Sequence, residues 1–340
     1  MNILVTGSAG YMGSHACLKL LEKGHRIVGI DNYSRGNRGA TEVLRQFDGF
    51  TFVKANIRDV HKLVNTFKKH DIEAVMHFAA YAYVGESCER PLMYYKNNVG
   101  GSLALLSAMG QAKVPRLVFS STCATYGEPD AEYIPIREDC PQRPINPYGH
   151  SKLMVEQAMR DFSTSSEAPE GFASVILRYF NVAGADPQGR LGEDHQPETH
   201  LIPLCLLTAL GKRERIDIYG TDYPTEDGTC IRDYVHVCDL VDAHIAALDG
   251  LEPGEERVYN VGTGNGFSVN EVVSACKTTT KIEFPTRSVD RRAGDPPILY
   301  ADASAIQKEI GWVPQRGALT TMIGDAWRWF EVNPEGFGSR

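Results

Sequence analysis

The chain has 340 residues, with 35 Lys and Arg against 43 Asp and Glu, so its formal charge at pH 7 is −8. Its 42% hydrophobic and 23% charged residues are typical of globular proteins and exclude a disordered or fibrous chain. Because neutralising phosphates needs clustered cations, we expect no nucleic-acid partner for an acidic chain that has no block of Lys and Arg.

The first 180 residues repeat one pattern, a short apolar run followed by a turn and an amphipathic stretch, which is typical of βαβ units. The expected strands are residues 2–6, 26–30, 50–54, 73–78, 116–120 and 173–177. A helix is expected at residues 11–23, since Met12, Ala16 and Leu20 recur every four residues on one face. Residues 1–180 are therefore predicted to form an α/β domain with a Rossmann-type, doubly wound parallel sheet.

A second, smaller region is expected from residue 181, where the composition turns to Gly, Pro and acidic residues. Residues 233–247 again have the pattern of a strand followed by a helix, and residues 258–261 that of another strand. Residues 181–340 are thus predicted to form a substrate-binding region, part of which, within residues 232–262, returns to the first domain.

No apolar run reaches the roughly 18 residues needed to cross a bilayer, and the start of the chain has neither a basic segment nor a cleavage site. We therefore expect no membrane partner and a cytoplasmic protein. The eight cysteines include no C-x-x-C pair and the ten histidines no spacing such as H-E-x-x-H, so neither disulfides nor a metal site is predicted. His77, inside an apolar run, is expected to be a core residue.

Three glycines, Gly7-x-x-Gly10-x-x-Gly13, lie between the first expected strand and the first expected helix. Small residues there let the backbone and the helix N-terminus approach a pyrophosphate. Asp31 ends the second expected strand, where a carboxylate accepts both ribose hydroxyls and repels a 2′-phosphate. The pattern favours NAD over NADP as cofactor, although three glycines also fit a simple tight turn and Asp31 also fits a turn or cap position.

Tyr148 and Lys152 lie four residues apart at the start of a helix that Pro147 introduces, so their side chains share one face. An ammonium near a phenol lowers the phenol's pKa from about 10 toward neutrality and makes it a general base. A surface pair on a solvated helix is the alternative. Because the hydroxyl cluster at residues 120–122 follows the fifth expected strand, where ligands bind in open α/β sheets, we predict an active site here.

With the glycine loop, these features resemble the extended branch of the short-chain dehydrogenase/reductase superfamily. Longer strings resemble the UDP-glucose 4-epimerases and the related UDP-pentose 4-epimerases over essentially the whole chain: HFAAYAYVGES, YYKNNVGG, FSSTCATYG, NPYGHSK, LRYFNVAGADP, GTDYPTEDGTCIRDYVHV and RRAGDPP. The resemblance implies NAD-dependent 4-epimerisation of a UDP-sugar through a transient 4-keto intermediate. The first reaction that the resemblance implies is the conversion of UDP-galactose to UDP-glucose. The alternative substrate is UDP-xylose or UDP-arabinose. The resemblance also implies a homodimer formed through a helical face of the first domain.

The same resemblance implies roles for individual residues. Tyr148 is the implied base on the sugar 4-hydroxyl, Lys152 its pKa partner, and Thr122 a hydrogen-bonding helper. The implied cofactor-binding residues are Gly7, Gly10, Tyr11, Met12, Gly13, Asp31, Asn32, Asn56, Ile57, Phe78, Ala79, Ala80, Asn97, Ser120, Tyr148, Lys152 and Tyr179. The implied substrate-binding residues are Thr122, Tyr148, Asn181, Leu201, Tyr219, Arg232, Arg292, Asp295 and Leu299.

Three positions depart from the family pattern. Ala82 stands where some members have a lysine that contacts cofactor phosphate, and Asn56 stands where the family often has Asp. Leu299 stands where a bulkier tyrosine in some members limits the space around the sugar C2 substituent, so N-acetylated hexoses stay open as substrates.

Three other functions also stay open. Nucleotide-sugar 4,6-dehydratases begin with the same oxidation, but they carry Asp-Glu after the threonine, where this chain has Cys123-Ala124. A dehydrogenase that releases NADH is disfavoured only by the family strings. The third is a non-catalytic nucleotide-sensing protein on the same scaffold. Such a protein has no need of the Tyr148 and Lys152 pair, and the presence of both residues disfavours this alternative.

Overall fold

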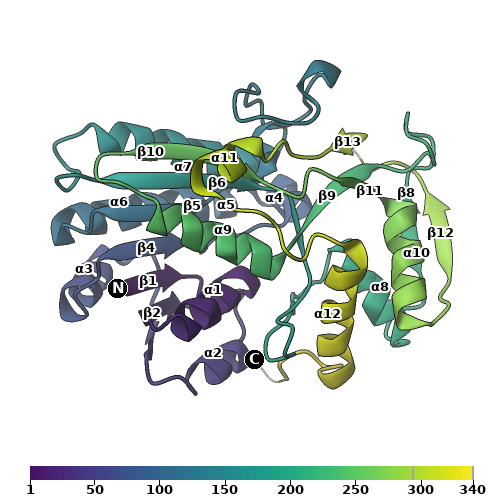
Figure 1. Cartoon of the computed structure of the whole chain (residues 1–340), viewed down its shortest axis with the longest axis horizontal. Helices are drawn as coiled ribbons and strands as arrows, with labels where there is room; N and C mark the ends of the chain where they lie inside the picture. Colours follow the sequence, from purple (N-terminus) through teal and green to yellow (C-terminus); the bar gives the residue numbers. More distant parts are fainter. Residues whose placement is uncertain (293–294, 339–340) are drawn as a thin grey trace.

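A seven-stranded parallel sheet is the largest layer of the fold (Figure 1). The structure, a computed structural model, describes residues 1–292 and 295–338. The strand order is β10-β6-β5-β4-β1-β2-β3, so the direction of winding reverses between β1 and β4, as in doubly wound sheets. The strands are β1 (Asn2–Thr6), β2 (Arg26–Asp31), β3 (Phe50–Lys54), β4 (Ala74–His77), β5 (Arg116–Ser120), β6 (Ala173–Tyr179) and β10 (Glu256–Val261).

Helices cover both faces of this sheet. Side chains alternate between the two faces along each strand, and apolar residues on each face pack against the helices on that side. Ile3 and Val5 of β1 pack into the core that includes α1, α2, α9 and α11, whereas Leu4 packs into the core that includes α3, α6 and α7. The first layer consists of α1 (Tyr11–Glu22), α2 (Arg38–Leu44), α9 (Val237–Asp249) and α11 (Ser304–Ile310). The second layer consists of α3 (Val60–Lys69), α6 (Gly100–Ala112) and α7 (Pro147–Ser163), with the short helices α4 (Val84–Glu89) and α5 (Pro91–Tyr94) before α6.

The remaining elements form two small sheets and a helical cluster at one end of the molecule (Figure 1). β9 pairs with β11 antiparallel and with β7 and β13 in parallel, while β8 pairs with β12. Side chains of α8, α10 and α12 share a core that includes the fully buried Trp329. The bounds are β7 (Asn181–Ala183), β8 (Ile216–Tyr219), β9 (Ile231–His236), β11 (Gly266–Ser268), β12 (Thr286–Val289), β13 (Ile298–Leu299), α8 (Leu201–Ala209), α10 (Val269–Thr280) and α12 (Leu319–Val332).

The predicted fold class is confirmed, and each strand expected in residues 1–180 is present with its bounds shifted by at most two residues. The strand predicted at 258–261 is β10, and it returns to the first sheet as expected, since it pairs with β6. The strand predicted near residue 233 is β9, which does not return, because β7, β11 and β13 occupy its edges. The division into domains at residue 180 stays a prediction.

Two polar residues inside the fold have structural roles. His77 is a core residue as predicted: its ring nitrogens lie 2.7 Å from the Thr6 hydroxyl and 2.8 Å from the Ser102 hydroxyl, and burial lowers its pKa to about 3. Asp233 of β9 is fully buried and accepts hydrogen bonds from the backbone nitrogens of Thr263, Gly264 and Ala301.

Within residues 1–292 and 295–338, every helix falls short of the length and apolar character that crossing a membrane requires.

Candidate active site

A cavity lies at the carboxyl ends of β1, β2 and β4, beside the point where the strand order reverses. Doubly wound folds bind their ligands at this position. The predicted cofactor residues that line it are Gly7, Gly10, Asp31, Asn32, Ile57, Phe78, Ala79, Ala80 and Asn97. The structure therefore brings these residues, from five separate segments of the chain, around one space.

The glycine loop is packed too closely for side chains. Gly7 has a φ of +71°, and a Cβ there would lie 2.8 Å from the backbone nitrogen of Ala79. A Cβ on Gly13 would lie 2.1 Å from the carbonyl oxygen of Gly7, so the first turn of α1 packs directly on the loop. Gly10 precedes α1 and has no side chain to cap it, which leaves first-turn N–H groups for a ligand. The loop thus fits the pyrophosphate of a dinucleotide.

Asp31 lies at the end of β2 in the same cavity. Its Oδ1 accepts a hydrogen bond from the Tyr33 nitrogen at 2.7 Å and its Oδ2 one from the Ala9 nitrogen at 3.1 Å. Burial raises the pKa of this carboxyl, and the backbone bonds oppose that rise. Arg35, a cation in the cavity lining, is held by both carboxylate oxygens of Glu86 at 2.5 and 2.6 Å. A carboxylate facing the ribose and an arginine already paired favour NAD over NADP.

Four further predicted cofactor residues adjoin the lining in sequence. Tyr11, Met12 and Gly13 form the first turn of α1, and the Tyr11 hydroxyl donates to the carbonyl of Gly184 at 2.7 Å. The side-chain oxygen of Asn56 accepts a hydrogen bond from the backbone nitrogen two residues on, at 3.0 Å. Their contacts with the cofactor stay predictions.

The predicted catalytic residues meet at the end of β5. The Asn146 side chain caps α7 by accepting a hydrogen bond from a first-turn N–H at 2.9 Å, which sets Tyr148 and Lys152 on the first turns of this helix. Both side chains are buried. The Thr122 hydroxyl is close enough to the Tyr148 phenol to lower its pKa, and Lys152 Nζ donates to the Ser120 carbonyl at 2.6 Å. The surface-pair alternative is thereby excluded.

His244 of α9 joins this cluster to the cavity. Its Nε2 lies 2.7 Å from the Ser120 hydroxyl, and this hydroxyl is close enough to the Tyr179 phenol to lower its pKa. The Phe78 ring, which lines the cavity, lies 4.8 Å from the His244 ring between centroids. The sequence analysis missed His244, because nothing in its apolar helix distinguishes it from a core residue.

The electrostatics of the cluster differ from the prediction. Burial raises the pKa of Tyr148 well above its ordinary value, Tyr179 adds to the rise, and the Thr122 hydroxyl offsets only part of it. Burial also lowers the pKa of Lys152 to about 7, although the Glu156 carboxylate opposes this. For the protein's own groups the shift in the pKa of Tyr148 runs opposite to the prediction, because burial disfavours the charged phenolate.

Five predicted substrate residues lie close together on the C-terminal elements. Arg232 of β9 forms an ion pair with Asp295, and the strand register places Leu299 of β13 beside Arg232. The Arg292 guanidinium lies 4.7 Å from the centre of the Tyr219 ring, which is 41% exposed. Asp295 offsets the charge of Arg232, so Arg292 is the more available cation for an anionic ligand.

The other two predicted substrate residues lie where elements begin. Asn181 starts β7, where it is in register with Tyr234 of β9, and Leu201 starts α8. The RRAGDPP string continues through Ala293 and Gly294, which lie outside the described residues. Which of these residues touch a substrate stays a prediction.

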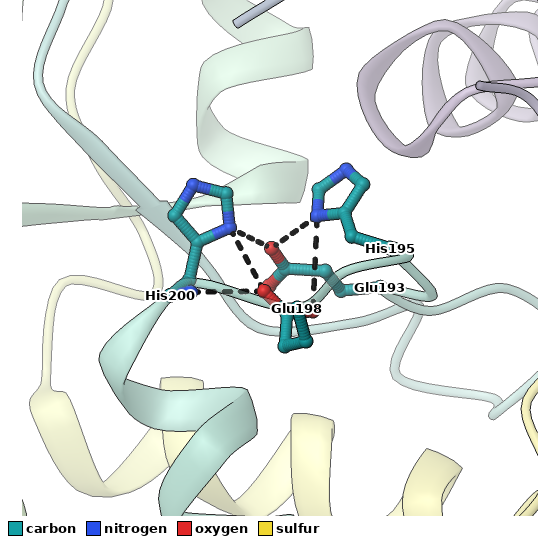
Figure 2. Close-up of side chains that lie close together, drawn as sticks. All are labelled: Glu193, His195, Glu198 and His200. Atoms are coloured by element: carbon teal, nitrogen blue, oxygen red, sulfur yellow. Dashed lines mark hydrogen bonds and ion pairs between the residues drawn. The ribbon is translucent and has the colours of Figure 1, made fainter. Parts of the chain in front are cut away.

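The sequence analysis also missed a cluster between β7 and α8. Glu193, His195, Glu198 and His200 bring one imidazole nitrogen or carboxylate oxygen each within 4.8 Å of one another (Figure 2). Burial opposes protonation of the two rings, but the carboxylates outweigh it and raise the pKa of His195 to about 9 and of His200 to about 10. The sequence signal that could have revealed this cluster is E-x-H-x-x-E-x-H at residues 193–200. It lies in a loop, so ligand spacings that belong to helices, such as H-E-x-x-H, do not apply to it. The absence of a metal site stays a prediction, although His195 and His200 do belong to a set of side chains that could hold a metal ion.

Comparison with known proteins identifies the family. The family model described as "NAD dependent epimerase/dehydratase family" matches residues 3–262, which is most of the chain. The chain belongs to this family.

Relatives in this family match the chain over its full length. The UDP-glucose 4-epimerase of Halalkalibacterium halodurans is 48% identical over 340 residues, covering 100% of this chain and 98% of that protein. The UDP-arabinose 4-epimerase 1 of Arabidopsis thaliana is 46% identical, covering 99% of this chain and 81% of that protein. The solved structure of the UDP-glucose 4-epimerase of Bifidobacterium longum with NAD⁺ and UDP superposes with a TM-score of 0.93 at 37% identity, covering 99% of this chain and 100% of that one.

For a member of the NAD dependent epimerase/dehydratase family, the cavity has the features that the cofactor needs. Gly7 and Asp31 line the cavity, and the close packing at Gly7 and Gly13 keeps the glycine loop against the start of α1. The resemblance seen in the sequence and the expectation of NAD as cofactor are confirmed.

Proposed function

We propose that the chain is an NAD-dependent UDP-sugar 4-epimerase that interconverts UDP-galactose and UDP-glucose. The observation that carries the proposal is the buried Tyr148 phenol, beside Thr122 and one helical turn from Lys152, at the sheet edge where the cofactor cavity lies. A proton acceptor on a sugar hydroxyl, next to a hydride acceptor, is what oxidation and reduction at one carbon require.

The protein's own residues supply the acid–base chemistry and the anchoring. NAD bound in the cavity would supply a reversible hydride acceptor for C4 of the sugar. Tyr148 holds the proton of the 4-hydroxyl during oxidation and returns it on reduction, and the Thr122 hydroxyl stabilises the phenolate. Because burial raises the pKa of Tyr148, proton removal depends on positive charge nearby, and Lys152, with a pKa of about 7, supplies it in its protonated form.

The diphosphate is held apart from the reacting carbon. Arg232 and Arg292, near Tyr219, provide guanidinium groups suited to a diphosphate. Binding energy placed on the nucleotide leaves the sugar ring free to turn and to present its other face. This arrangement supports epimerisation rather than a single oxidation with release of NADH.

The chain lacks the acid–base pair of a 4,6-dehydratase. Cys123 follows Thr122, and burial raises the pKa of this thiol to about 12, while Ala124 has no exchangeable proton. Neither residue moves a proton in the elimination of water, so this alternative is not supported.

A UDP-pentose 4-epimerase is the second candidate. The 46% identity with an Arabidopsis UDP-arabinose 4-epimerase favours it, and the half-buried Leu299 beside Arg232 leaves the sugar's size open. Parallel assays with UDP-galactose and UDP-arabinose distinguish the two by the ratio of kcat/KM.

The test of the function is direct. Purified protein is incubated with UDP-galactose, with and without added NAD, and UDP-glucose is quantified by chromatography. Tyr148→Phe should keep UDP binding and reduce turnover by about 100-fold or more, because it removes only the proton acceptor. Tyr259→Phe, on the edge strand β10 with its hydroxyl donating to Glu309, is the control and should leave turnover unchanged. Near-normal turnover in Tyr148→Phe, or no epimer from either sugar nucleotide, would refute the proposal.

We also propose a homodimer. α6 and α7 pack against each other, and each presents a large apolar side chain, Leu103 and Met154, both 48% exposed. A second copy of this face would cover them. Sedimentation equilibrium should give twice the chain mass, and Leu103→Glu should shift the protein toward monomer.

A further inference from the structure

The segment between β7 and α8 carries four side chains that converge on one point. In Figure 2 the two imidazole rings and the two carboxylates face one another across a small space. The Nδ1 atom of His195 lies 3.0 Å from a carboxylate oxygen of Glu193 and 3.7 Å from one of Glu198. The Nδ1 atom of His200 lies 2.6 Å and 3.3 Å from oxygens of the same two carboxylates.

Three of these four distances lie within about 0.4 Å of the spacing of ligand atoms around a zinc ion. Zinc bonds to imidazole nitrogen and carboxylate oxygen of about 2.1 Å place neighbouring ligand atoms of a tetrahedron about 3.4 Å apart. The four nitrogen–oxygen distances fall on both sides of this value, and all four ligand atoms lie within 4.8 Å. The His200–Glu193 pair, at 2.6 Å, would have to open by about 0.8 Å, and the other three distances would shift by about 0.1–0.4 Å to reach the tetrahedral spacing.

The charges also fit a divalent cation. The side chains of Glu193 and Glu198 are 3% and 8% exposed, so two carboxylates are buried side by side. Two buried negative charges need two positive ones nearby. One zinc ion with neutral imidazoles supplies the same compensation as two imidazolium rings, and it also uses the ring nitrogens as ligands.

Surrounding contacts hold the ligands in place, as second-shell groups do in metal sites. The Oε1 atom of Glu198 accepts hydrogen bonds from the backbone nitrogens of Thr199 and His200 at 2.7 and 2.9 Å, which leaves Oε2 toward His195. The His195 Nδ1 atom is buried without a well-formed hydrogen bond, although both carboxylates are near. The His195 ring also packs edge-on against Tyr11, at 6.1 Å between centroids.

We propose that Glu193, His195, Glu198 and His200 form a tetrahedral zinc site. The site lies next to Tyr11 at the start of α1, so a bound ion fixes the 193–200 segment against the helix that begins at the glycine loop. Its function is structural, because the ion's four positions are filled by protein atoms and none remains for a substrate.

Zinc binding by the full-length, tag-free protein tests the proposal. After treatment with a chelator, isothermal titration with Zn²⁺ should show one ion bound per chain, and thermal unfolding should move to higher temperature. Co²⁺ in place of Zn²⁺ should give visible d–d absorption without a thiolate charge-transfer band, since the eight cysteines are not ligands. His195→Gln and Glu198→Gln should each weaken Zn²⁺ binding by about 100-fold.

His61→Gln is the matched control, since His61 is exposed on α3 and contacts only a neighbouring side chain of its own helix in the described structure. It should bind Zn²⁺ as the parent does. The proposal is overturned if the parent binds no ion, if His195→Gln and Glu198→Gln, confirmed as folded by circular dichroism, bind as tightly as the parent, or if Co²⁺ shows a thiolate band. The last two outcomes would place the ion elsewhere, and the first would leave the cluster as an ion-pair network.

Discussion

Glu156 of α7 is the residue whose replacement tests the packing behind the candidate active site most severely. Its side chain is fully buried and accepts hydrogen bonds from Ser121 at 2.5 Å, from Gln142 at 3.0 Å and from two nitrogens of Arg178 at 3.1 and 2.7 Å. Arg160 lies 3.5 Å away. The substitution Glu156→Gln keeps the shape of the side chain and removes its charge.

The expected loss follows from what the change leaves behind. Arg178 is 2% exposed, so its guanidinium keeps a buried positive charge without its carboxylate. Removing one partner of a buried pair costs about 3–5 kcal/mol. The change also removes the negative charge that raises the pKa of Lys152, so this pKa should fall further below about 7.

Urea denaturation followed by fluorescence and by circular dichroism measures the stability. The control is Glu42→Gln, which breaks an exposed pair with Arg45 at 2.6 Å and should cost about 0.5 kcal/mol or less. If Glu156→Gln lowers the free energy of unfolding no more than Glu42→Gln does, the reasoning about this buried network is refuted.

Two further outcomes follow from the structure. Gly13→Ala places a methyl group 2.1 Å from the Gly7 carbonyl oxygen, so NAD affinity measured by titration calorimetry should fall by about tenfold or more, whereas Gly85→Ala, which meets open space, should leave it unchanged. Burial holds the pKa of folded His77 at about 3 against 6.5 when exposed, so the unfolded chain binds the extra proton and stability falls as pH drops through this interval. His77→Gln should remove about 1.4 kcal/mol per pH unit from that slope between pH 6 and 4.5, and an unchanged slope in urea midpoints would contradict this.

The first sheet was predictable because its strands are continuous apolar runs with regular helical spacing between them. β1 and α1 carry this pattern clearly, and their predicted bounds differ from the observed ones by at most one residue. The short strands β7, β11 and β13 have two or three residues each and were not predicted. Their pairing depends on β9, which lies far from them in the sequence, so no local pattern reveals it.

The candidate site also has features that the sequence predicts and features that it does not. Gly7, Asp31, Tyr148 and Lys152 carry recognisable spacing, and the structure brings them to one edge of the sheet. The shift in the pKa of Tyr148 depends on how deeply the phenol is buried, which a spacing of four residues does not specify. The cluster at residues 193–200 depends on a loop that folds back on itself, and helical ligand patterns do not describe such a loop.

The pairing of β9 limits how substrate preference can change. Leu299 is in register with Arg232, and two residues later Ala301 donates its backbone N–H to the buried Asp233 of the same strand. An insertion in this segment would break both contacts at once, whereas replacing the Leu299 side chain alters only its volume. Under the proposed function, sugar size should therefore be altered by substitution at position 299 and not by a change in the length of this segment.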